Sequence, residues 1–251
     1  MSYREVRPQE PALRAFVERL WTAARPAGAA SRVLPDGCVD LVFEHDGSGW
    51  SAELVGAATR AHVLAPAAAT RWCGVRFRPG GAAPLLSLPL GEVRDRAVPL
   101  RDVLPGAERL TAAIAGGGQR AFERLLLGAI RRDPDPGVQA AAQAIRRARG
   151  QVSIAHLADE LGWTRQHLAR RFRREVGVSP KAFARVARVQ AVVERVRAGG
   201  EPDWAGLALD AGYCDQAHLA GEFKRLVGLT PTQFARAEQV PFLQDADPAG
   251  R

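Results

Sequence analysis

The second half of the chain contains one residue pattern twice, and this internal repeat restricts the fold more than any other feature of the sequence. Residues 168–183 match residues 219–234 at a constant offset of 51. Upstream, Gly162 corresponds to Gly212 at an offset of 50, so the turn in the second copy is one residue longer. Self-similarity at a fixed period indicates that one supersecondary unit is built twice. The chain is therefore expected to hold two similar units in its second half.

The first copy has the pattern of two short helices separated by a tight turn. Ser153 is a suitable N-cap for a helix that runs to Leu161, and Gly162 supplies the left-handed residue that ends it. Thr164 then caps a second helix. The apolar residues of this second helix share one face, which consists of Leu168, Phe172 and Val176. Two short helices with a tight break between them predict a helix-turn-helix unit.

The second helix of this unit is rich in arginine on the surface that its apolar face leaves free. Its five arginines are Arg165, Arg170, Arg171, Arg173 and Arg174. The residues opposite the apolar face are Gln166, Ala169, Arg170 and Arg173. In a helix-turn-helix the N-terminal part of this face meets base edges in the major groove, where glutamine suits adenine and arginine suits guanine. We therefore expect Gln166 and Arg170 to read bases; the alternative is an ordinary solvated helix face.

The positive charge of the chain is concentrated around this unit. The net charge is +8, and between residues 145 and 197 thirteen arginine or lysine residues stand against four acids. Most of these cations are arginines, which suit phosphate and guanine recognition better than lysines do. A basic surface of this kind favours an anionic partner, and we expect double-stranded DNA.

The remaining composition argues against several classes of protein. Hydrophobic residues make up 47% and charged residues 25% of the chain, as in ordinary globular proteins. The cysteines Cys38, Cys73 and Cys214 form no CxxC pair, so we expect no disulfide framework, no metal and no cofactor. The chain shows neither a signal-peptide pattern nor an apolar run of roughly 18 residues. We therefore expect a cytoplasmic protein that is no enzyme and has no membrane partner.

The repeated motifs resemble those of the AraC/XylS transcriptional regulators. The matching residues are Ala158-x3-Gly162, His167-Leu168-x3-Phe172, Gly177-x-Ser179-Pro180-x2-Phe183, Asp215-Gln216-Ala217-His218-Leu219 and Gly228-x-Thr230-Pro231-x2-Phe234. The resemblance covers about residues 140–238. It implies two helix-turn-helix units joined by a long helix, here from about Pro180 to Ala198, with recognition helices that enter successive major grooves roughly 34 Å apart. The inward residues of the long helix are expected to be Phe183, Val186, Val189, Val193 and Val196.

The resemblance also assigns the residues that contact DNA. The base-reading positions fall on Gln166, Ala169 and Arg170 in the first unit, and on Gln216, Ala217, Ala220 and Gly221 in the second. The residues expected to contact phosphates are Thr164, Arg165, Arg171, Arg173, Arg174, Lys181, Lys224 and Arg225. Further partners that the resemblance implies are RNA polymerase, a small-molecule effector and a second copy of the chain in a homodimer.

The second unit departs from the common pattern of the family. Many members have arginine where this chain has Gly221, and Ala217 and Ala220 offer only methyl groups. Residues 198–237 also hold three cations against five acids. We therefore expect the first unit to supply most of the affinity and specificity. The second unit would add weak contacts or would instead face another protein.

The first half of the chain has a different character. Strand-like runs at 31–34, 39–43, 52–55, 62–65 and 71–78 are separated by glycine and proline, and helical patterns are expected at 11–21 and 121–130. These patterns predict an α+β chain. A small mixed β-barrel or sandwich with helices, cupin-like by resemblance, would precede an all-α double helix-turn-helix domain. The expected boundaries are 1–133 for a sensor or dimerisation domain, 138–238 for the DNA-binding domain and 239–251 for a flexible tail. The proline-rich segment 133–137 is expected to link the first two, because two prolines and a glycine cannot continue a helix.

Several residues of the first half are candidates for a functional site. Asp36, Asp40, His45 and His62 lack tight metal-ligand spacing, so we favour turn and surface roles. Arg76 and Arg78 would either meet an anionic ligand or lie exposed, and we favour exposure. Segments 34–41 and 74–80 resemble a poorly characterised branch of the same regulators.

Three classes of function remain open from the sequence. The first is a sequence-specific transcription factor whose first domain senses an effector or mediates dimerisation. The second is a DNA-binding module fused to an enzymatic or metal-binding domain. Alkyl-transfer repair proteins are one example, but the zinc ligands and the active-site string around Cys38 or Cys73 are missing. The third is a DNA-binding protein of low sequence specificity.

Overall fold

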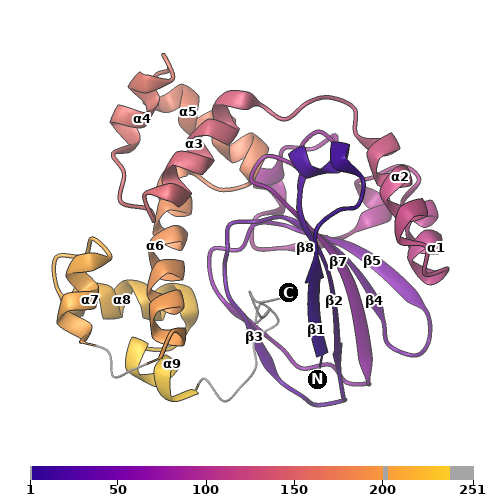
Figure 1. Ribbon diagram of the computed structural model, residues 1–251, viewed down its shortest axis with the longest axis horizontal. Coiled ribbons are helices and arrows are strands. Elements are labelled where there is room, and N and C mark those ends of the chain that lie inside the picture. Colours follow the sequence, from indigo (N-terminus) through magenta and orange to yellow (C-terminus); the bar gives the residue numbers. More distant parts are fainter. Residues whose placement is uncertain (1, 200–202, 238–251) are drawn as a thin grey trace.

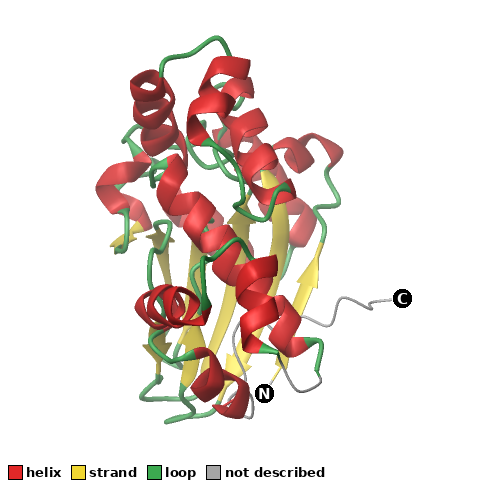
Figure 2. Ribbon diagram, turned by 90° about the vertical axis from the view of Figure 1, so that its left-hand side faces the viewer, coloured by secondary structure: helices red, strands yellow, loops and turns green. Residues whose placement is uncertain are grey.

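The structure consists of a strand-rich N-terminal half and a helical C-terminal half that lie side by side (Figure 1). The computed structural model describes residues 2–199 and 203–237. The tail expected at 239–251 lies outside the described residues. The long helix α6 (Pro180–Arg197) connects the upper and lower groups of helices and faces the N-terminal half (Figures 1 and 2).

An antiparallel sheet of six strands forms the centre of the N-terminal half. Its strand order is β1-β2-β7-β4-β5-β8, and a second sheet pairs β3 with β6. The strands are β1 (Ser2–Val6), β2 (Val17–Arg25), β3 (Ser31–Val33), β4 (Asp40–His45), β5 (Trp50–Val55), β6 (His62–Leu64), β7 (Thr70–Phe77) and β8 (Ala97–Pro99). The strand-rich, mixed character predicted for this half is confirmed.

The helix predicted at residues 11–21 is wrong. Residues Pro11–Ala15 form the short 3-10 helix η1, and the chain then enters strand β2 at Val17. Leu20 pairs with Val6 on one side and with Val75 on the other, so β2 is an interior strand of the sheet. Apolar residues three and four apart suit a helix face, but strand pairing across the chain decides the outcome here.

Each face of the six-stranded sheet is covered by a different element. One face packs against α1 (Ala107–Ala115) and α2 (Gln119–Ala129), where the Phe43 and Phe122 rings meet edge to face. The opposite face carries Trp21 and Trp72, and the β3–β6 ribbon packs over it through Val33 and Leu64. The ribbon and the sheet together make a sandwich-like domain.

The helical half follows the predicted repeat closely. Its helices are α3 (Pro136–Arg147), α4 (Ile154–Glu160), α5 (Arg165–Val176), α6, α7 (Trp204–Asp210), α8 (Gln216–Val227) and α9 (Pro231–Ala237). Ser153 accepts a hydrogen bond from the His156 amide at 3.3 Å, and Thr164 accepts one from the His167 amide at 3.1 Å. Gly162 has a φ of 66°, which favours glycine at this turn. The five inward residues predicted for the long helix are all buried.

The cores of the two halves are not separate. One continuous cluster of buried residues runs from the sheet through α3 and α5 to the first turns of α6. A second cluster joins the later turns of α6 to α7, α8 and α9, and it includes Leu34 from the N-terminal half. The helix α3 begins at Pro136, inside the proline-rich segment expected to link two domains. The first helix-turn-helix unit is therefore built onto the sheet domain, whereas the second has a core of its own.

We predict that Leu54→Ala in the sheet and Phe172→Ala in α5 lower the stability of the same cooperative unit. Both side chains are fully buried in the continuous cluster, so each truncation is expected to cost about 2–5 kcal/mol. Amide hydrogen exchange checks this, because Leu54→Ala should speed exchange in α4 and α5 as well as in the sheet. Leu209→Ala is a matched control, since Leu209 is 64% exposed. Unchanged protection of α5 in Leu54→Ala would contradict the prediction.

Candidate nucleic-acid interface and ligand cavity

The second helix of the first unit, α5, presents its expected DNA-reading face to solvent. Gln166 and Arg170 are exposed, and Ala169 between them is half-buried. Arg170 Nη2 lies 3.3 Å from Nδ1 of His167, one turn earlier on the same helix. The inner residues Leu168 and Phe172 are fully buried. The helix is thus held from behind while its N-terminal half is free to enter a groove.

The arginines expected to contact phosphates do not all lie free. Arg165 and Arg173 are exposed, as is Lys181 at the start of α6. Arg174 is also exposed, with its Nε 3.9 Å from Oε1 of Glu175. Arg171 instead forms an ion pair with Asp135. Thr164 serves as the helix N-cap, so its hydroxyl is already used within the chain. Arg171 therefore has a structural role, and its contact with phosphate stays a prediction.

Asp135 joins the start of α3 to the middle of α5. Its Oδ1 accepts a hydrogen bond from the Val138 amide at 3.1 Å, which caps α3, and its Oδ2 pairs with Arg171. Burial opposes ionisation of this carboxyl, but the hydrogen bonds from Arg171 and the Val138 amide hold its pKa below the ordinary value. The Arg132 guanidinium makes a similar contact with the buried Glu175 of α5, at 2.7 Å. The segment before α3 is thus attached to α5 at two points.

The second unit presents a smaller and less charged reading surface. Gln216 and Ala217 are exposed, Ala220 is half-buried, and Gly221 faces open space. Lys224 is exposed, whereas the Arg225 guanidinium lies 3.2 Å from Oε2 of Glu222. Asp215 caps α8 by accepting a hydrogen bond from the His218 amide at 2.7 Å. The scaffold of this unit equals that of the first, but it offers fewer groups to a nucleic acid.

A buried carboxylate that was not predicted from the sequence holds α8 against α6. The Glu222 side chain is 5% exposed and lies 2.9 Å from Nε of Arg185 and 3.4 Å from Nη2 of Arg188. It also accepts a hydrogen bond from the Tyr213 hydroxyl at 3.2 Å. Two of its cations come from α6, so this carboxylate fixes the second recognition helix to the long helix. At the offset of 51, the residue of the first unit that corresponds to Glu222 is Arg171. A comparison of the two copies therefore reveals an acid in the second unit where the first has a base.

The C-terminal ends of both recognition helices rest on the N-terminal half. Gly177, which ends α5, packs against Leu90 and Ala57. Gly228, which ends α8 at the equivalent repeat position, packs against Arg32. The ribbon also bonds to this end of α8, since the Ala61 amide donates to the Leu226 carbonyl at 2.6 Å. Both helices therefore point their N-terminal ends, with the base-reading positions, away from the sheet domain.

The loop of residues 34–38 forms a second contact between the halves. Gln190 of α6 donates a hydrogen bond to the Pro35 carbonyl at 2.6 Å, and Gly37 lies against the Phe183 ring, where a Cβ has no room. Arg146 of α3 donates to Oε2 of Glu18 at 2.9 Å and to Sγ of Cys38 at 3.0 Å. Burial raises the pKa of the Cys38 thiol well above its ordinary value, so this cysteine is a packed neutral thiol.

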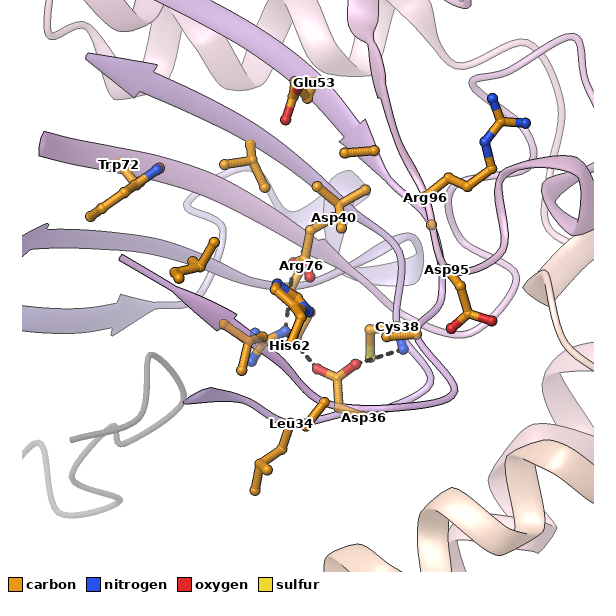
Figure 3. A pocket seen from close by; sticks show the side chains of 18 of the residues that line it. Leu34, Asp36, Cys38, Asp40, Glu53, His62, Trp72, Arg76, Asp95 and Arg96 are labelled. Carbon is orange, nitrogen blue, oxygen red and sulfur yellow. Dashed lines mark hydrogen bonds and ion pairs between the residues drawn. The ribbon is translucent and has the colours of Figure 1, made fainter. Parts of the chain in front are cut away.

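A cavity of about 390 Å³ lies between the β3–β6 ribbon and the sheet. Figure 3 shows Asp36, Asp40 and Arg76 together in it, with Trp72 and Glu53 further along the sheet. Its apolar lining includes Trp21, Val33, Val42, Val55, Leu64 and Trp72. The Trp21 indole lies on Gly74, and a Cβ at that position would overlap the ring. Cavities of this size and composition are typical of small-molecule sites.

One guanidinium in this cavity, that of Arg76, forms ion pairs with three carboxylates. Arg76 lies 3.2 Å from Glu5, 3.2 Å from Asp36 and 3.6 Å from Asp40. Its side chain is 15% exposed, so the expectation that it lies exposed is wrong. The strand register causes this, because it places Arg76 directly beside Asp40 of β4. Arg78 is exposed, as expected.

Burial sets the protonation of the acid at the centre of this network. It raises the pKa of Asp40 to about 7, against the opposing effect of Arg76. Asp36 also accepts a hydrogen bond from the Cys38 amide at 2.8 Å, as the predicted turn requires. His62 lines the cavity, and burial lowers its pKa.

The hypothetical metal cluster of Asp36, Asp40, His45 and His62 does not form, because His45 packs against Trp50 instead. In residues 2–199 and 203–237 no group of three His, Cys, Asp or Glu side chains is arranged to hold a metal ion.

Asp36, Asp40, His62 and Arg76 were site candidates from the sequence, but the cavity that they share with Trp21, Glu44 and Trp72 was not predicted, although a signal for it exists. Alternate positions of β4 hold Asp40, Val42 and Glu44, and alternate positions of β7 hold Trp72 and Arg76. A strand exposes alternate residues on one face, so each strand on its own marks a polar and aromatic face. The two faces lie side by side because β4 pairs with β7, and this pairing could not be read from either strand alone.

Comparison with known proteins matches each half separately. Residues 157–237 match a family described as a helix-turn-helix domain, and residues 4–99 match a domain of unknown function, DUF6597. A Streptomyces lividans protein described as a putative AraC-like transcription regulator is 29% identical over 108 residues, which is 43% of this chain and 35% of that protein. A Streptomyces antibioticus protein of the same description is 29% identical over 103 residues, 41% of this chain and 34% of that protein.

Two kinds of solved structure are similar to the chain. The C-terminal domain of AraT from Geobacillus stearothermophilus matches with a TM-score of 0.39 and 22% identity, covering 47% of this chain and 96% of that domain. ToxT from Vibrio cholerae matches with a TM-score of 0.44 and 12% identity, covering 87% of this chain and 98% of that one.

The C-terminal domain therefore belongs to a defined class. Residues 157–237 form a helix-turn-helix domain, and this part of the chain is similar to proteins described as putative AraC-like transcription regulators. The predicted resemblance to that family is confirmed, as is the order of a strand-rich domain before a helical one. The matched segments span only about a third of each curated relative. Among the described helices, none is both long and apolar enough to cross a membrane.

We predict that Asp135 contributes to stability through both its cap and its charge. Asp135→Ala removes the cap of α3 and the partner of Arg171, and is expected to cost about 1–3 kcal/mol at pH 7. Asp135→Asn should cost less, because asparagine also caps helices. Since the pKa of Asp135 is lowered on folding, the advantage of the native protein over Asp135→Asn is present above the ordinary value of 3.8 and is lost as the pH falls further. Chemical denaturation at pH 7 and pH 3 measures both effects, and equal losses in the two variants at pH 7 would contradict the prediction.

Proposed function

We propose that this protein is a transcriptional regulator that binds specific sequences of double-stranded DNA and is no enzyme. The observation that carries the proposal is the exposed face of α5, where Gln166 and Arg170 are exposed on the side opposite the fully buried Leu168 and Phe172. These two side-chain types pair with adenine and guanine in the major groove. Action on DNA would place the protein in the bacterial cytoplasm.

The two units would contribute unequally to DNA binding. In the first unit, Gln166, Ala169 and Arg170 would face bases, with Arg165, Arg173 and Arg174 on phosphates. In the second unit, Gln216 is the longest exposed side chain among the base-reading positions, and Gly221 adds no side chain at all. Arg225 is partly neutralised by Glu222. The first unit would therefore supply most of the sequence specificity.

The remaining phosphate contacts would come from residues at the edges of the two units. Lys181 and Lys224 are exposed and free of the ion pairs that hold Arg171 and Arg225 in the described part of the chain. Such contacts fix the register of the protein on DNA without reading its sequence. Thr164 would add to them only through its backbone amide, because its hydroxyl caps α5.

The N-terminal domain would sense a small-molecule effector. The cavity under the β3–β6 ribbon supports this, since it combines an apolar lining with a few charged groups. Its wall residue Asp36 lies in the same loop that contacts α3 and α6 through Gly37 and Cys38. A ligand that moves this loop would act directly on the helices that support both reading units. Contact with RNA polymerase and formation of a homodimer remain predictions.

We predict that selection from random double-stranded DNA at near-physiological salt enriches a single half-site. The asymmetry of charge and side-chain length between α5 and α8 is the reason. A pair of half-sites about one helical turn apart would show that both units read bases and would contradict the asymmetry. Binding without any enriched sequence, together with a steep salt dependence, would instead indicate a protein of low specificity and would contradict the proposed function.

We predict that Arg170→Ala weakens binding to the selected site by about 1–3 kcal/mol and relaxes its specificity at one position. Gln216→Ala, which truncates the longest side chain among the base-reading positions of α8, should cost clearly less. Both side chains are exposed, so neither change should alter folding. Fluorescence anisotropy with the selected site and single-base variants measures both effects. Equal losses for the two variants would overturn the unequal roles of the units.

A further inference from the structure

The cavity under the ribbon carries more negative than positive groups. Its lining carboxylates are Asp36, Asp40, Glu44, Glu53 and Asp95. Its lining guanidiniums are Arg60, Arg76 and Arg96. His62 adds little positive charge, because burial lowers its pKa. The lining thus holds two more carboxylates than guanidiniums, and Asp95 among them also pairs with Arg94 at 3.6 Å.

The arginine at the inner end of the cavity is already engaged by carboxylates. Arg76 is shared among Glu5, Asp36 and Asp40, and Arg19 also pairs with Glu5 at 3.5 Å. Oδ2 of Asp36 and Nε of Arg76 are both buried, and neither has a hydrogen-bond partner within the described part of the chain, although they form an ion pair at 3.2 Å. Burial is the main cause that raises the pKa of Asp40 to about 7, against the opposing effect of Arg76. Arg76 is therefore already engaged at this end and offers little to an anionic ligand.

Aromatic rings stand beside these carboxylates. The Trp21 indole nitrogen donates a hydrogen bond to Asp40 at 3.3 Å, and the Trp72 indole nitrogen donates one to Glu44 at 2.8 Å. The two bonds hold each carboxylate at the edge of an indole ring. Indole faces attract organic cations, most strongly where water is excluded. The Trp21 ring already lies between Tyr3 and Gly74, so Trp72 is the indole considered for a ligand. Both tryptophans are less than a tenth exposed.

We propose that this cavity binds an organic cation, an amine or quaternary ammonium on an apolar body, with the charged group beside Glu44 and the apolar body against Trp72. The volume of about 390 Å³ suits a ligand of small drug-like size. An anionic ligand of the same shape would meet more carboxylates than guanidiniums, and the Arg76 guanidinium is already engaged by Glu5, Asp36 and Asp40. This inference rests on the proposed sensing role of the N-terminal domain and names the chemical class that the domain senses.

Three probes of similar shape and different charge test the proposal: 2-phenylethylamine, 2-phenylethanol and 3-phenylpropionate. Isothermal titration calorimetry with the full chain is expected to show binding of the amine, with the alcohol about tenfold weaker and no binding of the acid. Equal or tighter binding of 3-phenylpropionate overturns the charge assignment. Absence of binding by all three probes overturns the site.

Substitution at Glu44 locates the bound charge. Glu44→Gln keeps an oxygen for the Trp72 hydrogen bond but removes the negative charge, and is expected to weaken 2-phenylethylamine about tenfold. Glu108→Gln is the matched control, because Glu108 is exposed on α1 and outside the cavity. If amine binding is unchanged in Glu44→Gln, the amine binds elsewhere and the proposal is wrong.

The DNA affinity of the same variants separates this inference from the proposed function. Without a probe present, Glu44→Gln should bind the selected DNA site as tightly as the native chain, since Glu44 lies on the sheet and away from α5 and α8. Intact DNA binding with no amine binding would overturn only the ligand class. Amine binding without any specific DNA binding would support the cavity and contradict the proposed regulator.

Discussion

The burial of α3 against the sheet domain is the contact on which the arrangement of the whole chain depends. Val138, Ala141 and Ile145 are completely buried, in the same cluster as the sheet residues and the inner face of α5. Burying these side chains stabilises the sheet domain and the first reading unit together, since apolar area removed from water is the largest favourable contribution to folding. The segment that the sequence marks as a linker therefore joins the two halves into one body.

The ligand cavity and the reading units are close neighbours in this body. Asp36 faces the cavity, while the adjoining Gly37 and Cys38 contact Phe183 and Arg146. The ion pairs of Arg76 and the helices that hold the two helix-turn-helix units are therefore connected by a single loop. Coupling over such a distance needs no long chain of intermediate residues, although it does need two arrangements of the loop that a ligand favours differently.

The sequence predicts the helical half well because its signals are local. Caps at Ser153 and Thr164, the turn at Gly162 and the repeated apolar spacing each act within a few residues, and the structure confirms them. The N-terminal half depends on pairing between distant strands, so the local pattern around Val17 predicts a helix where a strand forms. The same reason hides the binding partners of Arg76, which come from β1, β4 and the preceding loop. The faces of a strand can be predicted from its own residues, but their neighbours are set by register.

Gly177 and Gly228, at matching positions of the two units, rest on two separate parts of the sheet domain. The glycine after each recognition helix thus seats that helix on a common support, in addition to the connection through α6. The distance and the angle between the two reading surfaces are consequently a property of the sheet domain as well as of the helical domain. On DNA, a shift of half a helical turn between two contact sites would have to be absorbed by twisting the duplex, or by releasing α8 from the ribbon. Isolating residues 138–237 would remove this support and would widen the range of spacings that the two units tolerate.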